Sequence, residues 1–294
     1  MDTVVVRVPA TIANLGSGFD AIGLALSWHN EVRIERRRDD VVVVSGVGDL
    51  ANGLPRDSTN LIVRSLESVM GPLRSITVNQ IVAIPMGRGF GSSAAAVVGG
   101  LVGARALAGT DDTDEQLLER AVTFEGHADN VAPCLLGGIT VSTAESTLRI
   151  DPPASIKPLV CVAPQAMQTK VARAALPTEV SRADATANLG RAALLVAALS
   201  QGRSDVLMDA TKDLLHQPVR FGLMPESGEL VRALRAEGIA AFLAGAGPSV
   251  AALVDDKAAL NGETTARALL PEGWDVRLES IDPQGARIVS EREK

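Results

Sequence analysis

The chain has 294 residues, enough for two ordinary domains or one large one, and its 46% hydrophobic and 21% charged residues are typical of a soluble globular protein. A net charge of −7, no tyrosine and only five phenylalanines and two tryptophans argue against nucleic-acid binding through phosphate contacts or base stacking. No apolar run approaches the roughly 20 residues of a membrane helix and no leader pattern opens the chain, so a cytoplasmic protein without a membrane partner is expected.

The first eighty or so residues predict a mainly antiparallel sheet with one amphipathic helix at 58–70. Strands are expected where apolar residues alternate or run together, at residues 4–8, 21–28, 31–38 and 41–44. Residues 9–20 are too many for a tight hairpin, so a longer connection is predicted there. In that connection, Asn14 and Asp20 either project into a site or form an ordinary Asx-type turn.

A glycine-rich loop follows an apolar strand at about residues 76–84 and opens an alanine-rich helix that runs to about residue 107. The loop contains three alternating glycines and then two serines, Gly87, Gly89, Gly91, Ser92 and Ser93. Glycines let backbone N–H groups approach an anion, and a helix N-terminus leaves such groups unpaired and partly positive. The pattern predicts a phosphate-binding loop in which one of the serines caps the helix. It lacks the lysine of the standard P-loop and the third glycine of the dinucleotide fingerprint.

A second helix is predicted at residues 111–125, with a capping box formed by Thr113 and Gln116. It runs into a polar cluster that consists of Glu125, His127, Asp129 and Asn130. Such a cluster is often a solvated loop, but residues 131–141 turn apolar at once, which favours the mouth of a partly buried site. Carboxylates beside a bound polyphosphate are natural ligands of Mg²⁺, because this ion takes oxygen ligands and bridges phosphates. A lone histidine is more often structural.

A proline-rich break at residues 151–153 predicts a domain boundary, with domains at 1–152 and 153–294. Helices are expected in the second half at 169–176, 183–199, 204–215, 227–237 and 257–269. Strands are expected at 159–163, 239–243, 250–254 and 275–278, with a second glycine loop at 244–249 and a charged tail at 291–294. This alternation favours a small α+β layer domain. Cys134 and Cys161 lie in apolar surroundings and are predicted to be buried free thiols.

Three motifs, at residues 9–20, 85–94 and 244–249, together resemble the GHMP kinase superfamily of small-molecule kinases. Within that superfamily, Ala-Asn-Leu-Gly-Ser-Gly-Phe-Asp at 13–20 and Glu-Gly-His-Ala-Asp-Asn-Val-Ala-Pro at 125–133 resemble the homoserine kinases. The resemblance implies an α+β, two-domain GHMP kinase architecture, with a ribosomal-S5-like N-terminal domain, a ferredoxin-like C-terminal domain and the site between them. It also implies transfer of phosphate from ATP, with Mg²⁺, to the side-chain hydroxyl of L-homoserine in threonine biosynthesis.

The resemblance also implies roles for particular residues. The substrate would be held at its amino and hydroxyl ends by Asn14, Asp20 and Asn130, and at its carboxylate by Arg182 and Arg220. Asn60 would lie near adenine, and Mg²⁺ would contact Ser93 and Glu125, with Glu119 as a rival. The catalytic candidates are His127, Asp129 and Asn130, although homoserine kinases are thought to need no general base. The phosphates would be held by Pro85, Met86, Gly87, Arg88, Gly89, Phe90, Gly91, Ser92, Ser93, Ala94 and Ala95.

Three other functions stay open at this point. The protein could be a GHMP-type kinase of the mevalonate or shikimate class, a dinucleotide-dependent oxidoreductase built on the strand–loop–helix at residue 84, or a non-catalytic module that uses an S5-like domain to bind RNA. The missing third glycine argues against the oxidoreductase, and the acidic charge argues against the RNA module. A homodimer is compatible with the sequence, but no feature demands one.

Overall fold

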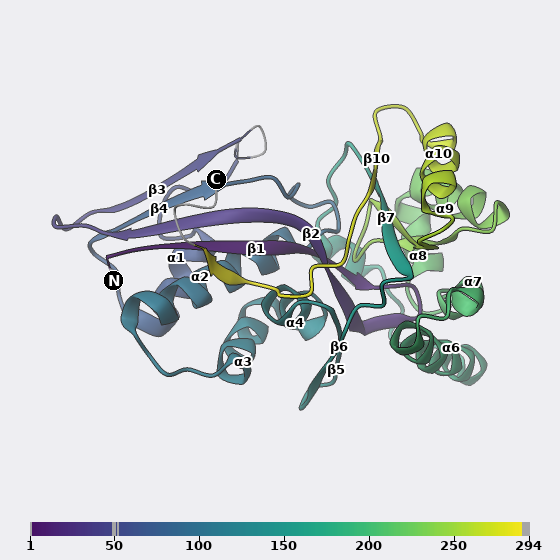
Figure 1. Ribbon diagram of the computed structural model, residues 1–294, viewed down its shortest axis with the longest axis horizontal. Helices are drawn as coiled ribbons and strands as arrows, with labels where there is room; N and C mark the ends of the chain where they lie inside the picture. The colour runs from purple at the N-terminus through teal and green to yellow at the C-terminus, as the bar shows by residue number, and fades with distance from the viewer. Residues whose placement is uncertain (1, 49–50, 52, 290–294) are drawn as a thin grey trace.

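Two lobes lie end to end along the long axis of the molecule (Figure 1). The computed structural model describes residues 2–48, 51 and 53–289, so the predicted charged tail at 291–294 lies outside the described residues. In this part of the chain no helix is long and apolar enough to cross a membrane.

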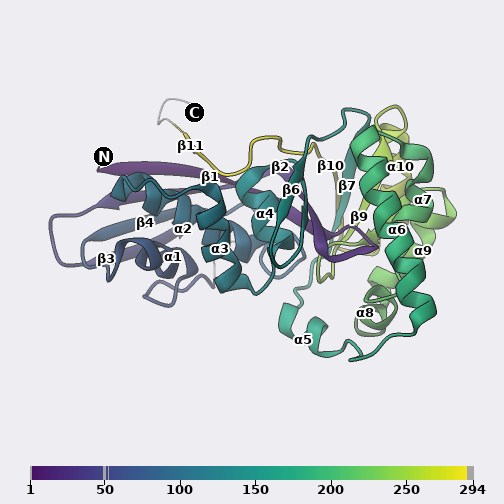
Figure 2. The same ribbon diagram turned by 90° about the horizontal axis from the view of Figure 1, so that it is seen from below.

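The first lobe holds, within the described residues, a mixed sheet of seven strands with the path β11-β1-β2-β4-β3, in which β5 also pairs with β2 and β6 pairs with β5. These strands are β1 (Thr3–Asn14), β2 (Gly18–Arg36), β3 (Val42–Val47), β4 (Ile76–Ile81), β5 (Ile139–Ser142), β6 (Thr147–Ile150) and β11 (Arg287–Val289). The face of the sheet seen in Figure 2 is covered by the helices α1 (Leu61–Met70), α2 (Ser92–Ala108), α3 (Asp114–Glu125) and α4 (Ala128–Leu136).

Helix α2 lies at the centre of this lobe and is buried on nearly all sides. Its glycines permit that position, because a Cβ atom at Gly103 would lie 2.2 Å from Cδ1 of Ile34, and one at Gly100 would lie 2.8 Å from the carbonyl oxygen of Ile62. The predicted alanine-rich helix is thus confirmed. Its close packing against the sheet and α1 fixes the place of the glycine loop at its N-terminus.

Strands β1 and β2 form one long hairpin, so the predicted long connection over residues 9–20 is wrong. The ladder continues from Ala10↔Leu26 to Asn14↔Gly18, and the connection is a tight turn at residues 15–17. Register shifts at Pro9/Ala10 and Ala13/Asn14 accommodate the proline and the polar residues that made this stretch look irregular. Left-handed backbone at Asn14, Leu15 and Gly16 closes the turn. The predicted strands at 21–28 and 31–38 are both parts of β2.

The second lobe contains the sheet β10-β7-β9-β8, in which every described pair is antiparallel. Its strands are β7 (Ile156–Val162), β8 (Ala240–Leu243), β9 (Val250–Asp255) and β10 (Asp275–Leu278). Its helices are α5 (Thr169–Ala174), α6 (Arg182–Gln201), α7 (Leu207–Ala210), α8 (Gln217–Leu223), α9 (Pro225–Ala236) and α10 (Ala259–Leu269). The first and last strands of this unit are neighbours, which is the ferredoxin-like arrangement that the resemblance implied.

Three helices differ from their prediction, and two of them, α4 and α8, were not predicted at all. The helix expected at 204–215 is a 3₁₀ turn (Ser204–Val206) followed by the short α7. It ends early because the Asp213 carboxylate accepts hydrogen bonds from the backbone N–H groups of Leu215, His216 and Gln217, and so caps α8 instead. Helix α4 was not predicted, because it begins within the polar cluster and contains Pro133.

The chain crosses between the lobes in both directions. The tip of the β1–β2 hairpin reaches the second lobe, where Ser17 donates a hydrogen bond to the Ala210 carbonyl and Asn188 donates one to the Ser17 carbonyl. In return, β11 leaves the second lobe and pairs antiparallel with β1. The predicted division at residue 152 therefore separates the two sheets except for β11.

Candidate active site

A cavity of about 1000 Å³ lies between the lobes and is lined by residues from both. The first lobe contributes the glycine loop, the hairpin tip and the start of α4, and the second contributes residues 166–169, Arg173, Arg220 and the loop at 245–247. This cavity brings the three sequence motifs together at one place.

The glycine loop adopts left-handed backbone at Gly87, Gly89 and Gly91, with φ of 66°, 87° and 62°. A Cβ atom at Gly89 would lie 2.1 Å from the Ala244 carbonyl oxygen, so the two glycine loops can touch only because this side chain is absent. The predicted serine cap is wrong, because the N-cap of α2 is Gly91 and no described side chain caps this helix. The first-turn N–H groups are therefore available to a phosphate.

Most of the predicted phosphate loop lines the cavity. The lining residues are Met86, Gly87, Gly89, Phe90, Gly91, Ser92, Ser93 and Ala95. Pro85 and Ala94 are buried behind them, and Arg88 lies half-buried outside the lining.

Ser93 and Glu125 form the pair that suits a metal. The Ser93 hydroxyl donates to the Glu125 carboxylate at 2.9 Å, and both residues line the cavity beside the loop. Burial raises the pKa of Glu125, and the hydrogen bond from Ser93 opposes that rise. One hydroxyl and one carboxylate fit Mg²⁺, which prefers oxygen ligands and takes the rest from phosphates and water. The rival Glu119 is exposed on α3, outside the lining.

His127, Asp129 and Asn130 stand together where α4 begins. The imidazole Nδ1 of His127 is hydrogen-bonded to the buried Asp129 carboxylate, and this bond raises the pKa of His127. Thr11 donates to the Asn130 side-chain oxygen at 2.8 Å. The carboxylate of Asp129 is thus already engaged by the imidazole.

Arginine side chains gather near the hairpin tip, but they are not the pair that the resemblance implied. Arg173 on α5 binds the Asp20 carboxylate with two hydrogen bonds of 2.7 and 2.8 Å. Arg220 on α8 is 2% exposed, and its Nε atom has no hydrogen-bond partner among the described residues. Burial, followed by the nearby Arg173, lowers the pKa of Arg220. Arg182 is exposed at the start of α6 and lies outside the lining.

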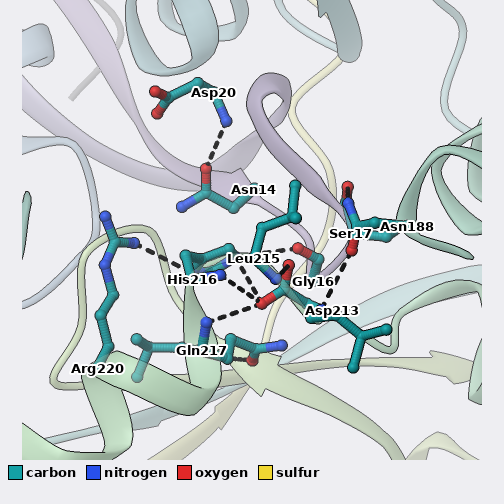
Figure 3. A network of polar contacts seen from close by, with 12 residues as sticks. Asn14, Gly16, Ser17, Asp20, Asn188, Asp213, Leu215, His216, Gln217 and Arg220 are labelled. Atoms are coloured by element: carbon teal, nitrogen blue, oxygen red, sulfur yellow. Dashed lines mark hydrogen bonds and ion pairs between the residues drawn. The ribbon is translucent and has the colours of Figure 1, made fainter. Parts of the chain in front are cut away.

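Two predicted ligands use their side chains within the protein. Asn14 donates to the Gly245 carbonyl at 2.9 Å and accepts from the Asp20 backbone N–H at 3.0 Å, as Figure 3 shows for the second of these bonds. Asn60 caps α1 by accepting from the Ile62 N–H. Both residues line the cavity, so they shape its wall whether or not they also touch a ligand.

Sequence reasoning missed Arg173 and Thr11. Arg173 and Arg182 lie close together in the chain, and nothing in the sequence around them distinguishes the two. The place of Arg173 in the site depends on its ion pair with Asp20, which belongs to the other lobe. Thr11 lies inside a strand, and a Cβ atom at Gly91 would lie 1.9 Å from its Oγ1. Its contact with Gly91 and Asn130 depends on the hairpin that was not predicted.

Comparisons with known proteins agree with this architecture. The family domain described as "GHMP kinases N terminal domain" matches residues 60–138, and "GHMP kinases C terminal" matches residues 191–266. A crystal structure of mevalonate kinase covers 95% of this chain with a TM-score of 0.68 at 15% identity, a likeness of fold alone. The chain has the fold and the family domains of a GHMP kinase.

Relatives of higher sequence identity show to which family of GHMP kinases the chain belongs. The homoserine kinase of Streptomyces avermitilis is 46% identical over 295 residues, with 97% of this chain and 95% of the relative covered. The crystal structure of homoserine kinase from Cytophaga hutchinsonii has a TM-score of 0.88 at 28% identity and covers 98% of both chains. The chain belongs to the homoserine kinase family.

Proposed function

We propose that the protein transfers the γ-phosphoryl group of ATP to the side-chain hydroxyl of L-homoserine, which gives O-phospho-L-homoserine for threonine biosynthesis. The observation that carries this proposal is the charge set at the hairpin tip, where Arg173 and Arg220 face one carboxylate, Asp20.

The charge set suits a zwitterionic amino acid. Arg173 is paired with Asp20, whereas Arg220 contacts no carboxylate within hydrogen-bonding distance among the described residues, so a substrate carboxylate would give the Arg220 guanidinium a charged partner. Asp20 would receive the substrate's ammonium group. Mevalonate and shikimate each carry a carboxylate but no ammonium group, so they would leave Asp20 without that partner.

The glycine loop would hold the phosphates through backbone N–H groups and the polarity of α2. Mg²⁺ held by Ser93 and Glu125 would neutralise phosphate charge. Phosphoryl transfer then depends mainly on how the acceptor hydroxyl is positioned. In the described part of this end of the cavity, Asp20 is paired with Arg173 and Asp129 with His127, so neither carboxylate is free to act as a base. We infer that the hydroxyl proton passes to the transferred phosphate.

A coupled assay of ADP release tests the proposal. We expect turnover with L-homoserine at a kcat/KM at least about tenfold above that with L-serine, which is one methylene shorter. L-Threonine and mevalonate serve as further acceptors. Faster turnover with mevalonate would move the protein to another GHMP class. We place the reaction in the cytoplasm, where ATP is available and where the free, buried Cys134 and Cys161 stay reduced.

A further inference from the structure

His216 is a buried polar residue that lies behind the carboxylate-binding arginine. It precedes α8 directly, is 0% exposed, and comes one helical turn before Arg220. Residues four apart on a helix lie on the same face. Figure 3 shows the imidazole between the Arg220 side chain and the Gly16 carbonyl at the hairpin tip.

The two ring nitrogens of His216 have partners of opposite kind. Arg220 Nη1 lies 3.2 Å from Nδ1, and a guanidinium can only donate, so Nδ1 must be an acceptor without a proton. Nε2 lies 3.0 Å from the Gly16 carbonyl oxygen, which can only accept, so Nε2 must carry the proton. The Nδ1 contact requires a neutral ring and the Nε2 contact places the proton on Nε2, so together they specify one neutral tautomer.

The surroundings of the ring favour that neutral form. Burial has the largest influence on the pKa of His216 and lowers it. The Asp213 carboxylate raises this pKa, and the positive charge of Arg220 lowers it further. Asp213 is already engaged by three backbone N–H groups at the start of α8. The Phe19 ring stacks on the imidazole with centroids 4.9 Å apart, and the Arg220 guanidinium lies 5.4 Å from the centroid of the same ring.

These contacts tie the two ends of the proposed substrate site together. Nη1 of Arg220 is held by His216 and by the Gly245 carbonyl at 3.1 Å, so its orientation depends on two acceptors. Through Gly16, the same imidazole holds the hairpin that carries Asp20. The geometry points to His216 as a positioning residue: in its neutral, Nε2-protonated form it orients Arg220 toward the substrate carboxylate and fixes this helix against the hairpin of Asp20. This inference rests on the proposed function.

The first test reads the tautomer directly. In wild-type protein labelled with ¹⁵N at histidine, we expect His216 at neutral pH to show a protonated Nε2 and an unprotonated Nδ1. The chain has three histidines, so His216→Asn protein identifies the resonance by its loss. A protonated Nδ1 would overturn the inference. This NMR measurement does not require the substrate to be known, so its result is independent of the proposed function. A failure of the proposed function would instead appear in the assay of the wild-type protein with homoserine.

A pair of variants then separates the two contacts. The Asn oxygen occupies the place of Nδ1, so His216→Asn keeps an acceptor for Arg220, whereas His216→Gln reaches the place of Nε2 and keeps only the donor to Gly16. We expect the KM for homoserine to rise about tenfold or more in His216→Gln and about threefold or less in His216→Asn, because a hydrogen bond to a charged group is lost in the first. The KM for ATP should stay unchanged in both. Equal increases for homoserine, or a parallel increase for ATP, would reduce His216 to a structural residue and overturn the inference.

Discussion

Arg173 and Arg182 carry the same charge on neighbouring helices, but they differ in what surrounds them. Arg173 meets Asp20 in the cavity, and Arg182 lies outside its lining. We expect Arg173→Gln to raise the KM for homoserine by about tenfold or more, because a bidentate, charge-assisted contact at the site is lost. Arg182→Gln, the matched control, should change it by less than about twofold, as expected for an exposed side chain. Steady-state kinetics with saturating ATP measure both. The opposite order would restore the assignment to Arg182.

The residues that could be predicted are those whose function follows from their own stretch of sequence. Gly87, Gly89 and Gly91 predicted a phosphate loop because alternate glycines before a helix have few other uses, and most of that loop lines the cavity. The predicted Arg182 lies outside the cavity lining, whereas Arg173 lines the cavity and pairs with Asp20, which is far away in the chain. The serine cap was wrong because α2 begins at Ser92 after the N-cap Gly91, so both serines lie inside the first turn of the helix.

At the scale of elements, the fit between the two glycine loops decides whether the phosphate site can form. Gly89 has left-handed backbone and a methyl group there would clash with the Ala244 carbonyl, whereas Gly190 lies exposed in α6, where an added methyl group would have nothing within 4 Å. We expect Gly89→Ala to lower the free energy of unfolding by about 2 kcal/mol or more and to raise the KM for ATP. Gly190→Ala should instead gain about 0.5–1 kcal/mol, since alanine favours a helix. Urea unfolding measures both, and a neutral Gly89→Ala would refute the close contact.

Elements with a strong period of their own were predicted well. The capping box of Thr113 and Gln116 is present at the start of α3, and the four strands of the second sheet lie close to where they were expected. The β1–β2 hairpin was not predicted, because Pro9, Gly16 and Gly18 are typical of a loop. The β-bulges and the tight turn that place these residues in one hairpin cannot be seen in the sequence. Helix α4 was hidden by its polar first turn and by Pro133.

At the scale of the whole molecule, Asp282 joins the end of the chain to the first lobe. This residue is 2% exposed, and its carboxylate contacts His29 on β2 and accepts from Arg287 at 3.0 Å. Burial opposes ionisation, but the hydrogen bonds from His29, the Gln284 N–H and Arg287 outweigh it and hold the pKa of Asp282 well below its usual range.

We therefore expect Asp282→Asn to lower the free energy of unfolding at neutral pH by about 2 kcal/mol or more. A carboxyl whose folded pKa is depressed stabilises fully above its unfolded pKa of about 3.9, and this contribution is lost as the pH falls toward the folded value. The difference between wild type and variant should thus shrink below about pH 4. Denaturation at neutral and acidic pH measures it. Asp151→Asn, which removes an exposed partner of Arg149, is the control and should have little effect at either pH.

The pairing of β11 with β1 has a consequence for how the protein is made. Val5 pairs with Val289, so the outer edge of the first sheet is completed by a strand that follows the whole second lobe in the chain. Until then β1 exposes a row of unpaired backbone groups, and unpaired edges are templates for wrong association. The nascent chain therefore carries an open edge until the whole second lobe has been synthesised. Stalled or prematurely terminated chains that lack residues 287–289 should be the species that chaperones retain.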